Sequence, residues 1–126
     1  MMTVLLSIKP EFADKIFSGE KKYEYRKSIF KHPDVKRIIV YSSSPQQRII
    51  GEFYIEEILQ GDIEMIWDKT HLYSGISKEY FMSYFANRNK GYAIKIGKTK
   101  KYRKMKLLSD LNLTTAPQSF IYIKDK

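Results

Sequence analysis

Three charged side chains that could act together lie near the start of the chain, in the stretch GEKKYEYRK at positions 19–27. Glu24 and Arg26 are two residues apart, so in a strand they lie on one face, where a carboxylate and a guanidinium pair and still offer hydrogen bonds outward. Lys21 precedes them, and its long side chain can reach the same space from a turn. Together they predict a polar cluster able to bind a base edge, a phosphate or a carboxamide. On spacing alone, the alternative is a surface ion pair worth under about 1 kcal/mol.

If the chain is an enzyme, Lys21 and Glu24 are the candidate catalytic residues. Lys21 would act as a base or nucleophile only if burial or a neighbouring cation lowered its pKa. The chain has no cysteine, which excludes disulfides, thiol nucleophiles and cysteine-ligated metal sites. Its two histidines, His32 and His71, lack metal-ligand spacing, and no phosphate-binding glycine loop is present. We therefore expect no metal and no cofactor.

The composition favours a polyanionic partner without proving one. There are 23 Lys and Arg residues against 14 Asp and Glu residues, a formal net charge of +9. This surplus of positive charge raises the rate of encounter with nucleic acid, although surplus lysine also increases the solubility of many proteins. A basic run at 98–106, which includes Lys100, Lys101 and Arg103, either follows a phosphate backbone or forms the solvated face of a hairpin. Several aromatic residues either stack on bases or belong to the core and its rim: Tyr23, Tyr25, Tyr41, Tyr54 and Trp67.

The elements that position these residues follow from hydrophobic spacing. A strand at Val4–Ile8 precedes a helix that begins at Pro10 and ends at Gly19, because proline suits a first helical position and glycine a left-handed end. The next strand, 22–27, puts Tyr23 and Tyr25 on the face opposite Glu24 and Arg26. Further strands are expected at 36–42, 48–59, 92–98 and 120–123, with short helices capped by Asp62 and Ser77, the second ending at Gly91.

Short strands outnumber helices, which predicts an α+β domain spanning 1–126, with a curved sheet capped by helices. No apolar span approaches the roughly 20 residues that a membrane helix requires. The opening residues MMTVLLSIKPEF lack the apolar core of a signal peptide. We therefore expect a cytoplasmic protein with no membrane partner.

The stretch LSIKPEFADKIFSGEKKYEYRK resembles the opening of ASCH domains, whose hallmark G-x-K-x-x-E-x-R is matched by Gly19, Lys21, Glu24 and Arg26. The later stretches YSSSPQQRIIGEF and APQSFIYI also resemble members of this family, so the similarity covers nearly the whole chain. The resemblance implies a PUA-like fold, a small and partly closed β-barrel capped by helices, with a cleft beside the hallmark.

In that fold Lys21, Glu24 and Arg26 line the cleft, with Lys9 and Ser42 as neighbours. PUA-like relatives bind RNA, and ASCH domains have been proposed to bind RNA during translation, coactivation or RNA processing. The resemblance therefore implies RNA or a modified nucleoside as partner. Lys21 and Glu24 would read a base edge, a tyrosine would stack on the base, and Arg26 and the basic run would contact phosphate.

Two other functions remain open. One branch of the family hydrolyses N4-acetylcytidine with a lysine, a threonine nucleophile and a glutamate. Lys21 matches the lysine, but Glu24 stands at the threonine position, and a carboxylate does not replace a hydroxyl as acyl acceptor without a change of mechanism. Another member has been reported as a ribonuclease, so a hydrolase acting on nucleosides or RNA is the alternative. A non-catalytic module for an acidic protein partner is the third hypothesis.

Overall fold

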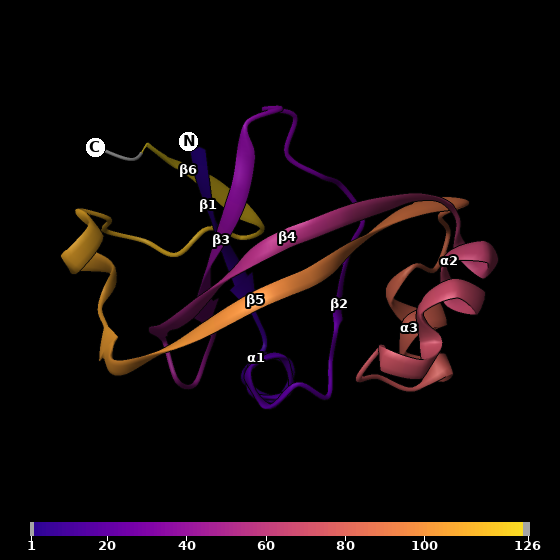
Figure 1. Cartoon of the computed structure of the whole chain (residues 1–126), viewed down its shortest axis with the longest axis horizontal. Coiled ribbons are helices and arrows are strands. Elements are labelled where there is room, and N and C mark those ends of the chain that lie inside the picture. The colour runs from indigo at the N-terminus through magenta and orange to yellow at the C-terminus, as the bar shows by residue number, and fades with distance from the viewer. Residues whose placement is uncertain (1, 125–126) are drawn as a thin grey trace.

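The structure is a computed structural model that describes residues 2–124 and contains one sheet with three α-helices packed around it (Figure 1). The elements in chain order are β1 (Met2–Ile8), α1 (Pro10–Ser18), β2 (Tyr23–Arg26), β3 (Val35–Ser42), β4 (Arg48–Asp62), α2 (Ile63–Thr70), α3 (Lys78–Tyr84), β5 (Lys90–Lys106) and β6 (Phe120–Lys124). Short 3₁₀ turns cover His71–Tyr73 and Leu108–Leu111. No helix among the described residues is long and apolar enough to span a membrane.

The strands form a six-stranded sheet in the order β2-β5-β4-β3-β1-β6. β1 and β3 are parallel, and the other neighbouring pairs are antiparallel. β4 and β5 are the two longest strands, and they carry α2 and α3 between them at one end of the molecule (Figure 1). Register shifts in the β3–β4 and β4–β5 pairs bend and twist the sheet, as bulges do.

Three clusters of buried side chains hold the sheet and helices together. The largest joins the inner face of the sheet to α1, through Ala13 and Ile16 of the helix. A second lies beneath α2 and α3 around Phe81 and Phe85. The third, around Leu5 and neighbouring residues, fills the opposite face of the sheet under the turn at 108–111 and β6. Burial on both faces fixes the register of the central strands, because a slip of one residue would exchange the two faces.

The expected α+β architecture is confirmed. Gly19 ends α1 in the left-handed conformation with a φ of +89°, and the Ser77 hydroxyl accepts a hydrogen bond from the Tyr80 N–H at 3.0 Å at the start of α3. Asp62 precedes α2, but its side chain makes no capping hydrogen bond. The expectation that Gly91 ends the second helix is wrong, because Gly91 lies inside β5 and pairs with Gly61 of β4.

The sheet remains open, so the barrel is only loosely closed. Its edge strands β2 and β6 are not hydrogen-bonded to each other. Curvature nevertheless brings the end of β2 to the residues just before β6, where Arg26 Nη2 donates a hydrogen bond to Ser119 Oγ at 2.6 Å. A side chain therefore bridges the seam that backbone pairing leaves open.

Candidate functional site

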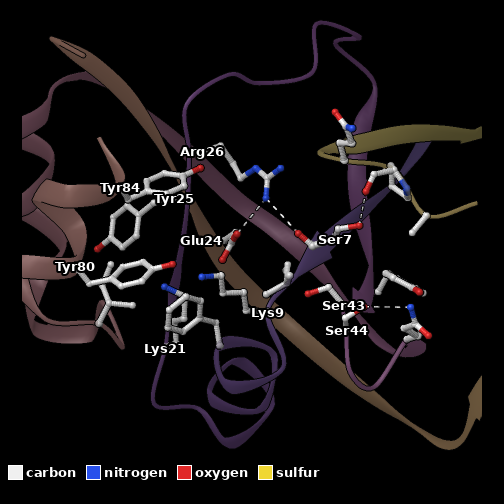
Figure 2. Close-up of a pocket in the computed structure, with 18 residues that line it drawn as sticks. Ser7, Lys9, Lys21, Glu24, Tyr25, Arg26, Ser43, Ser44, Tyr80 and Tyr84 are labelled. Carbon is white, nitrogen blue, oxygen red and sulfur yellow. Dashed lines mark hydrogen bonds and ion pairs between the residues drawn. The ribbon is translucent and has the colours of Figure 1, made fainter. Parts of the chain in front are cut away.

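A cavity of about 430 Å³ opens beside this seam, between the start of α1, strand β2, the loop after β3, helix α3 and the segment before β6 (Figure 2). Its basic lining residues are Lys9, Lys21 and Arg26, and within the part of the chain that the structure describes its one acidic lining residue is Glu24. The side chains of Lys21, Glu24 and Arg26, which the sequence predicts to form one polar cluster, therefore line the same cavity.

Lys21 is the most unusual of these residues, because it is 2% exposed. Its Nζ donates a hydrogen bond to the Ser74 carbonyl oxygen at 2.7 Å and lies 4.8 Å from the ring centroid of Tyr25. Burial lowers the pKa of Lys21 from 10.5 to about 8, and Glu24 opposes this shift while Lys15 adds to it. The amine is thus mainly charged at neutral pH and half deprotonated near pH 8, so it can donate a proton or, above that pH, accept one.

The backbone around Lys21 is fixed on both sides. The left-handed Gly19 ends α1 and turns the chain, and the Lys21 N–H donates to the Lys15 carbonyl oxygen at 3.0 Å. The Lys22 N–H donates to the Tyr73 carbonyl oxygen at 2.8 Å. Lys15 Nζ also donates to the carbonyl oxygen of Gly75, at 3.0 Å. Two lysine side chains therefore anchor the 73–76 loop against α1 and the start of β2.

Gly75 packs directly against Lys21, which predicts an effect of adding one methyl group. Gly75 has a φ of +70°, and a Cβ there would lie 2.6 Å from Lys21 Cβ, whereas Gly19 has a φ of +89° and its Cβ would meet nothing within 4 Å. Both substitutions to alanine carry the left-handed backbone cost, but only Gly75→Ala adds overpacking. We expect Gly75→Ala to lower the free energy of unfolding in urea by about 2 kcal/mol more than Gly19→Ala. Equal losses would contradict this packing.

Glu24 and Arg26 form a mostly buried ion pair. Arg26 Nη1 lies 3.4 Å from Glu24 Oε2, and the two side chains are 11% and 9% exposed. Nη1 also donates a long hydrogen bond of 3.5 Å to the Ser7 carbonyl oxygen on β1. Together with the hydrogen bond to Ser119 Oγ, these contacts direct the Arg26 guanidinium mainly toward groups within the protein. Among residues 2–124, the second Glu24 oxygen, Oε1, has no such contact, so it is the acceptor that Glu24 can offer to a ligand.

Three tyrosines gather at one side of the cavity (Figure 2). Thr70 Oγ1 donates to the Ile66 carbonyl oxygen at 2.7 Å, so Tyr25 donates its hydroxyl hydrogen to Thr70 in their 2.7 Å contact. Burial raises the pKa of Tyr25 to about 12, which keeps it neutral and structural. Burial also raises the pKa of Tyr84. Tyr80 is half-buried and packs edge-on against Phe12 at a centroid distance of 5.1 Å, which leaves it available to a ligand.

The remaining predicted site residues occupy different places. Lys9 is exposed and lines the cavity, with its Nζ 5.4 Å from the Tyr80 ring centroid. Ser42 is fully buried in β3, and its hydroxyl has no hydrogen-bond partner among residues 2–124. It is not among the residues that line the cavity, whereas its neighbours Ser43 and Ser44 are. The basic residues Lys100, Lys101 and Arg103 lie on the outer half of β5, exposed and outside the cavity.

Sequence reasoning missed several residues of the cavity wall. Tyr80 and Tyr84 come from α3, and residues 116–118 come from the segment before β6. The stretches YSSSPQQRIIGEF and APQSFIYI contained part of this signal, because they include Ser43, Ser44 and residues 116–118 of the wall. No group of three or more metal-ligating side chains occurs among the described residues.

Known proteins resemble this chain in sequence and in structure. A family model described as the ASCH domain matches residues 6–100. Large ribosomal subunit protein uL22 of Ureaplasma parvum is 34% identical over 122 residues, which cover 97% of this chain and 39% of that protein. The ASCH domain-containing ribonuclease of Zymomonas mobilis is 34% identical over 89 residues, 71% of this chain and 60% of that protein. The chain thus spans less than two thirds of the length of each of these relatives.

The crystal structure of ASCH from Zymomonas mobilis superposes on this fold with a TM-score of 0.88 at 29% sequence identity, covering 97% of this chain and 87% of that chain. With 97% of the chain covered, the similarity in three dimensions extends beyond residues 6–100, which the family model matches.

Proposed function

The chain belongs to the ASCH domain family, and we propose that it binds RNA or a modified nucleoside in the cavity lined by Lys21, Glu24 and Arg26. One observation carries the proposal: the three hallmark side chains converge on a single cavity, and one of them is a buried lysine. Burying a charged amine costs free energy unless it is compensated. A lysine that is buried beside an open cavity despite this cost is typical of a functional site.

The cavity supplies the groups that recognise a nucleobase. Lys21 Nζ donates hydrogen bonds and Glu24 Oε1 accepts them, which complements the mixed donor and acceptor pattern of a base edge. Tyr80 offers a partly exposed aromatic face, and sequence-specific RNA readers stack splayed-out bases on such rings. We propose that Arg26 acts by orienting Glu24, because its own hydrogen bonds are directed to Glu24, Ser7 and Ser119.

Lys100, Lys101 and Arg103 are proposed to contact the RNA backbone outside the cavity. They lie on the second half of β5, where the side chains are mostly exposed. Such contacts release counterions and make affinity fall as salt rises. A regulatory role in translation or RNA processing is consistent with a binding domain of this kind and remains part of the proposal.

The affinity of a short single-stranded RNA, measured as salt is raised, tests this proposal. We expect the logarithm of affinity to fall with the logarithm of salt concentration, with a slope of about −0.7 for each phosphate contacted. Replacing Lys100, Lys101 and Arg103 together by alanine should make that slope shallower by about 2. The matched control removes three charges elsewhere, at the exposed Lys31, Lys36 and Arg88, and should leave the slope unchanged. A flat salt response in the wild type would contradict phosphate contact.

A hydrolase acting on RNA or nucleosides is the second candidate, favoured by the lowered pKa of Lys21. An amine with a pKa of about 8 can act as a general acid near neutral pH or stabilise charge on a phosphate in a transition state. The Zymomonas mobilis relative named as a ribonuclease supports the ribonuclease form of this candidate. The cavity lacks the threonine of the N4-acetylcytidine hydrolases at position 24, which disfavours the amidohydrolase form.

Labelled RNA and N4-acetylcytidine, each incubated with the wild type and with Lys21→Ala, separate binding from hydrolysis. Product that disappears in Lys21→Ala would establish catalysis in the cavity. Product that persists in Lys21→Ala would come from a contaminating enzyme, and absence of product alongside RNA binding would leave a binding domain.

A further inference from the structure

We propose that the cavity takes a nucleotide with its phosphate, in a fixed orientation: the base at the tyrosine end and the phosphate at the end formed by Ser43 and Ser44, within reach of Lys9. The inference rests on the proposed function, because it concerns the same cavity and specifies its ligand. It predicts that a nucleoside monophosphate binds better than the neutral nucleoside of the same base.

The charge of the cavity wall is the first reason. Three basic lining residues, Lys9, Lys21 and Arg26, face one acidic residue, Glu24. The Glu24–Arg26 ion pair is internally compensated, so Lys9 and Lys21 are left as the surplus charges. A neutral nucleoside compensates neither of them, whereas a phosphate group does. The cavity therefore favours an anionic ligand.

The arrangement of donors and rings gives the ligand a direction. Figure 2 shows Tyr25, Tyr80 and Tyr84 on one side and Ser43 and Ser44 on the opposite side, with Glu24 and Lys9 between them. The aromatic side suits the flat face of a base. The hydroxyls of the serine side suit the oxygens of a phosphate.

The serine end is fixed by hydrogen bonds and still has hydroxyl donors that a ligand can use. The Ser43 N–H donates to the Ile8 carbonyl oxygen at 2.9 Å, which fixes the loop against the end of β1. Gln47 Nε2 donates to Ser44 Oγ at 3.1 Å, so the Ser44 hydroxyl keeps its own hydrogen for a ligand. Lys9 follows β1 directly, next to this loop. Its exposed ammonium lies 5.4 Å from the Tyr80 ring centroid, and its long flexible side chain can turn toward the serines when a phosphate binds there. Two hydroxyl donors and one ammonium can pair with the oxygens of one phosphate.

Arg26 is better placed to build the cavity than to bind this phosphate. Its guanidinium donates to Ser119, Glu24 and Ser7. The cavity volume of about 430 Å³ falls in the range of about 300–1,000 Å³ that small-molecule sites occupy. It therefore has room for one small ligand, and the remainder of an RNA strand must lie outside, toward the basic half of β5.

The test compares each of the four common nucleosides with its own 5′- and 3′-monophosphates by calorimetric titration into the wild type at neutral pH. We expect the preferred monophosphate to bind about ten-fold or more tightly than its nucleoside, the contribution of one charge-assisted hydrogen bond. The double variant Lys9→Gln/Ser43→Ala should bind the monophosphate no better than the nucleoside. Lys22→Gln removes an equivalent exposed charge outside the cavity and should preserve the preference.

Equal affinity for nucleoside and monophosphate in the wild type would overturn the phosphate end and leave the proposed function intact. The same loss of preference in Lys22→Gln would also overturn it, because the preference would then reflect net charge. RNA binding with no measurable mononucleotide binding would contradict a nucleotide-sized site. Failure of RNA, nucleosides and nucleotides alike to bind would instead refute the proposed function itself.

Discussion

Lys21→Met is expected to lower the affinity for a short single-stranded RNA about 100-fold at pH 7, the usual effect of removing one partner of a buried charged contact. Methionine has a similar length and an uncharged, flexible side chain, so it can fill the same space against Phe12 and Tyr25. The change removes the charged donor at the base of the cavity without opening a large void. Calorimetric or fluorescence titration measures the loss.

The fold should survive this change, which separates a binding role from a structural one. Loss of the hydrogen bond to the Ser74 carbonyl oxygen costs stability, but removal of a buried charge at pH 7 offsets that cost. We therefore expect a melting temperature at least as high as that of the wild type. Lys22→Met is the matched control, because Lys22 is adjacent, exposed and outside the cavity, and it should keep nearly full affinity. Equal affinity losses in both variants would refute a specific role for Lys21.

Arg26→Ala is expected to produce the largest loss of stability among the cavity residues. It leaves the Glu24 carboxylate buried without its cation and removes the contacts from β2 to Ser7 and Ser119. Breaking a buried ion pair from one side costs about 3–5 kcal/mol. In a domain of this size that loss corresponds to a fall in melting temperature of about 10 °C or more. RNA affinity should fall as well, because Glu24 and the two sides of the seam lose their alignment.

Arg88→Ala provides the comparison for Arg26→Ala. Arg88 is exposed, so its loss should change the free energy of unfolding by no more than about 0.5 kcal/mol. Ser119→Ala should lower stability less than Arg26→Ala does, and a double-mutant cycle of the two should show coupling, because they share one hydrogen bond. Additive effects at these two positions would contradict a bridge across the open seam.

The hallmark could be placed from the sequence because its positions depend on local rules. Pro10 and Gly19 bound the helix, and alternation in the following strand puts Glu24 and Arg26 on the same side. Lys21 precedes β2, so strand alternation does not constrain it, and its long side chain reaches the cavity from the turn. What the sequence could not show is the burial of Lys21, since the 73–76 loop that covers it lies more than fifty residues away along the chain.

The rest of the cavity depends on contacts between distant segments. Arg26 and Ser119 are 93 residues apart, and only the curvature of the sheet brings them together. The sequence predicts a strand that ends at residue 98, because residues 98–106 are mostly charged. In the structure β5 continues to Lys106, and its outer half pairs with β4, for example between Lys101 and Gly51. Ser42 and Ser43 are adjacent, yet only Ser43 lines the cavity. Successive side chains in a strand point to opposite faces, so Ser42 points away from the face on which Tyr41 lines the cavity.

The pH dependence of RNA affinity tests the central claim that charged Lys21 in this cavity binds the ligand. The groups around Lys21 Nζ are Glu24 and Lys15, with the aromatic rings of Phe12 and Tyr25, and Lys9 and Arg26 line the same cavity. Tyr25 has its pKa raised to about 12 and Lys9 has its pKa raised above 10.5, so neither titrates near pH 8. Lys21, with a pKa lowered to about 8, is the cavity group that does.

If the protonated amine binds the ligand, affinity should be nearly constant below about pH 7 and fall about ten-fold between pH 7 and pH 9, as the amine with a pKa of about 8 loses its proton. The single measurement is the RNA affinity of the wild type over this range, with Lys21→Met measured in parallel at each pH. The account predicts a wild-type decline with a midpoint near pH 8 and a flat, weak profile in Lys21→Met. A flat wild-type profile, or the same decline in both proteins, would contradict it.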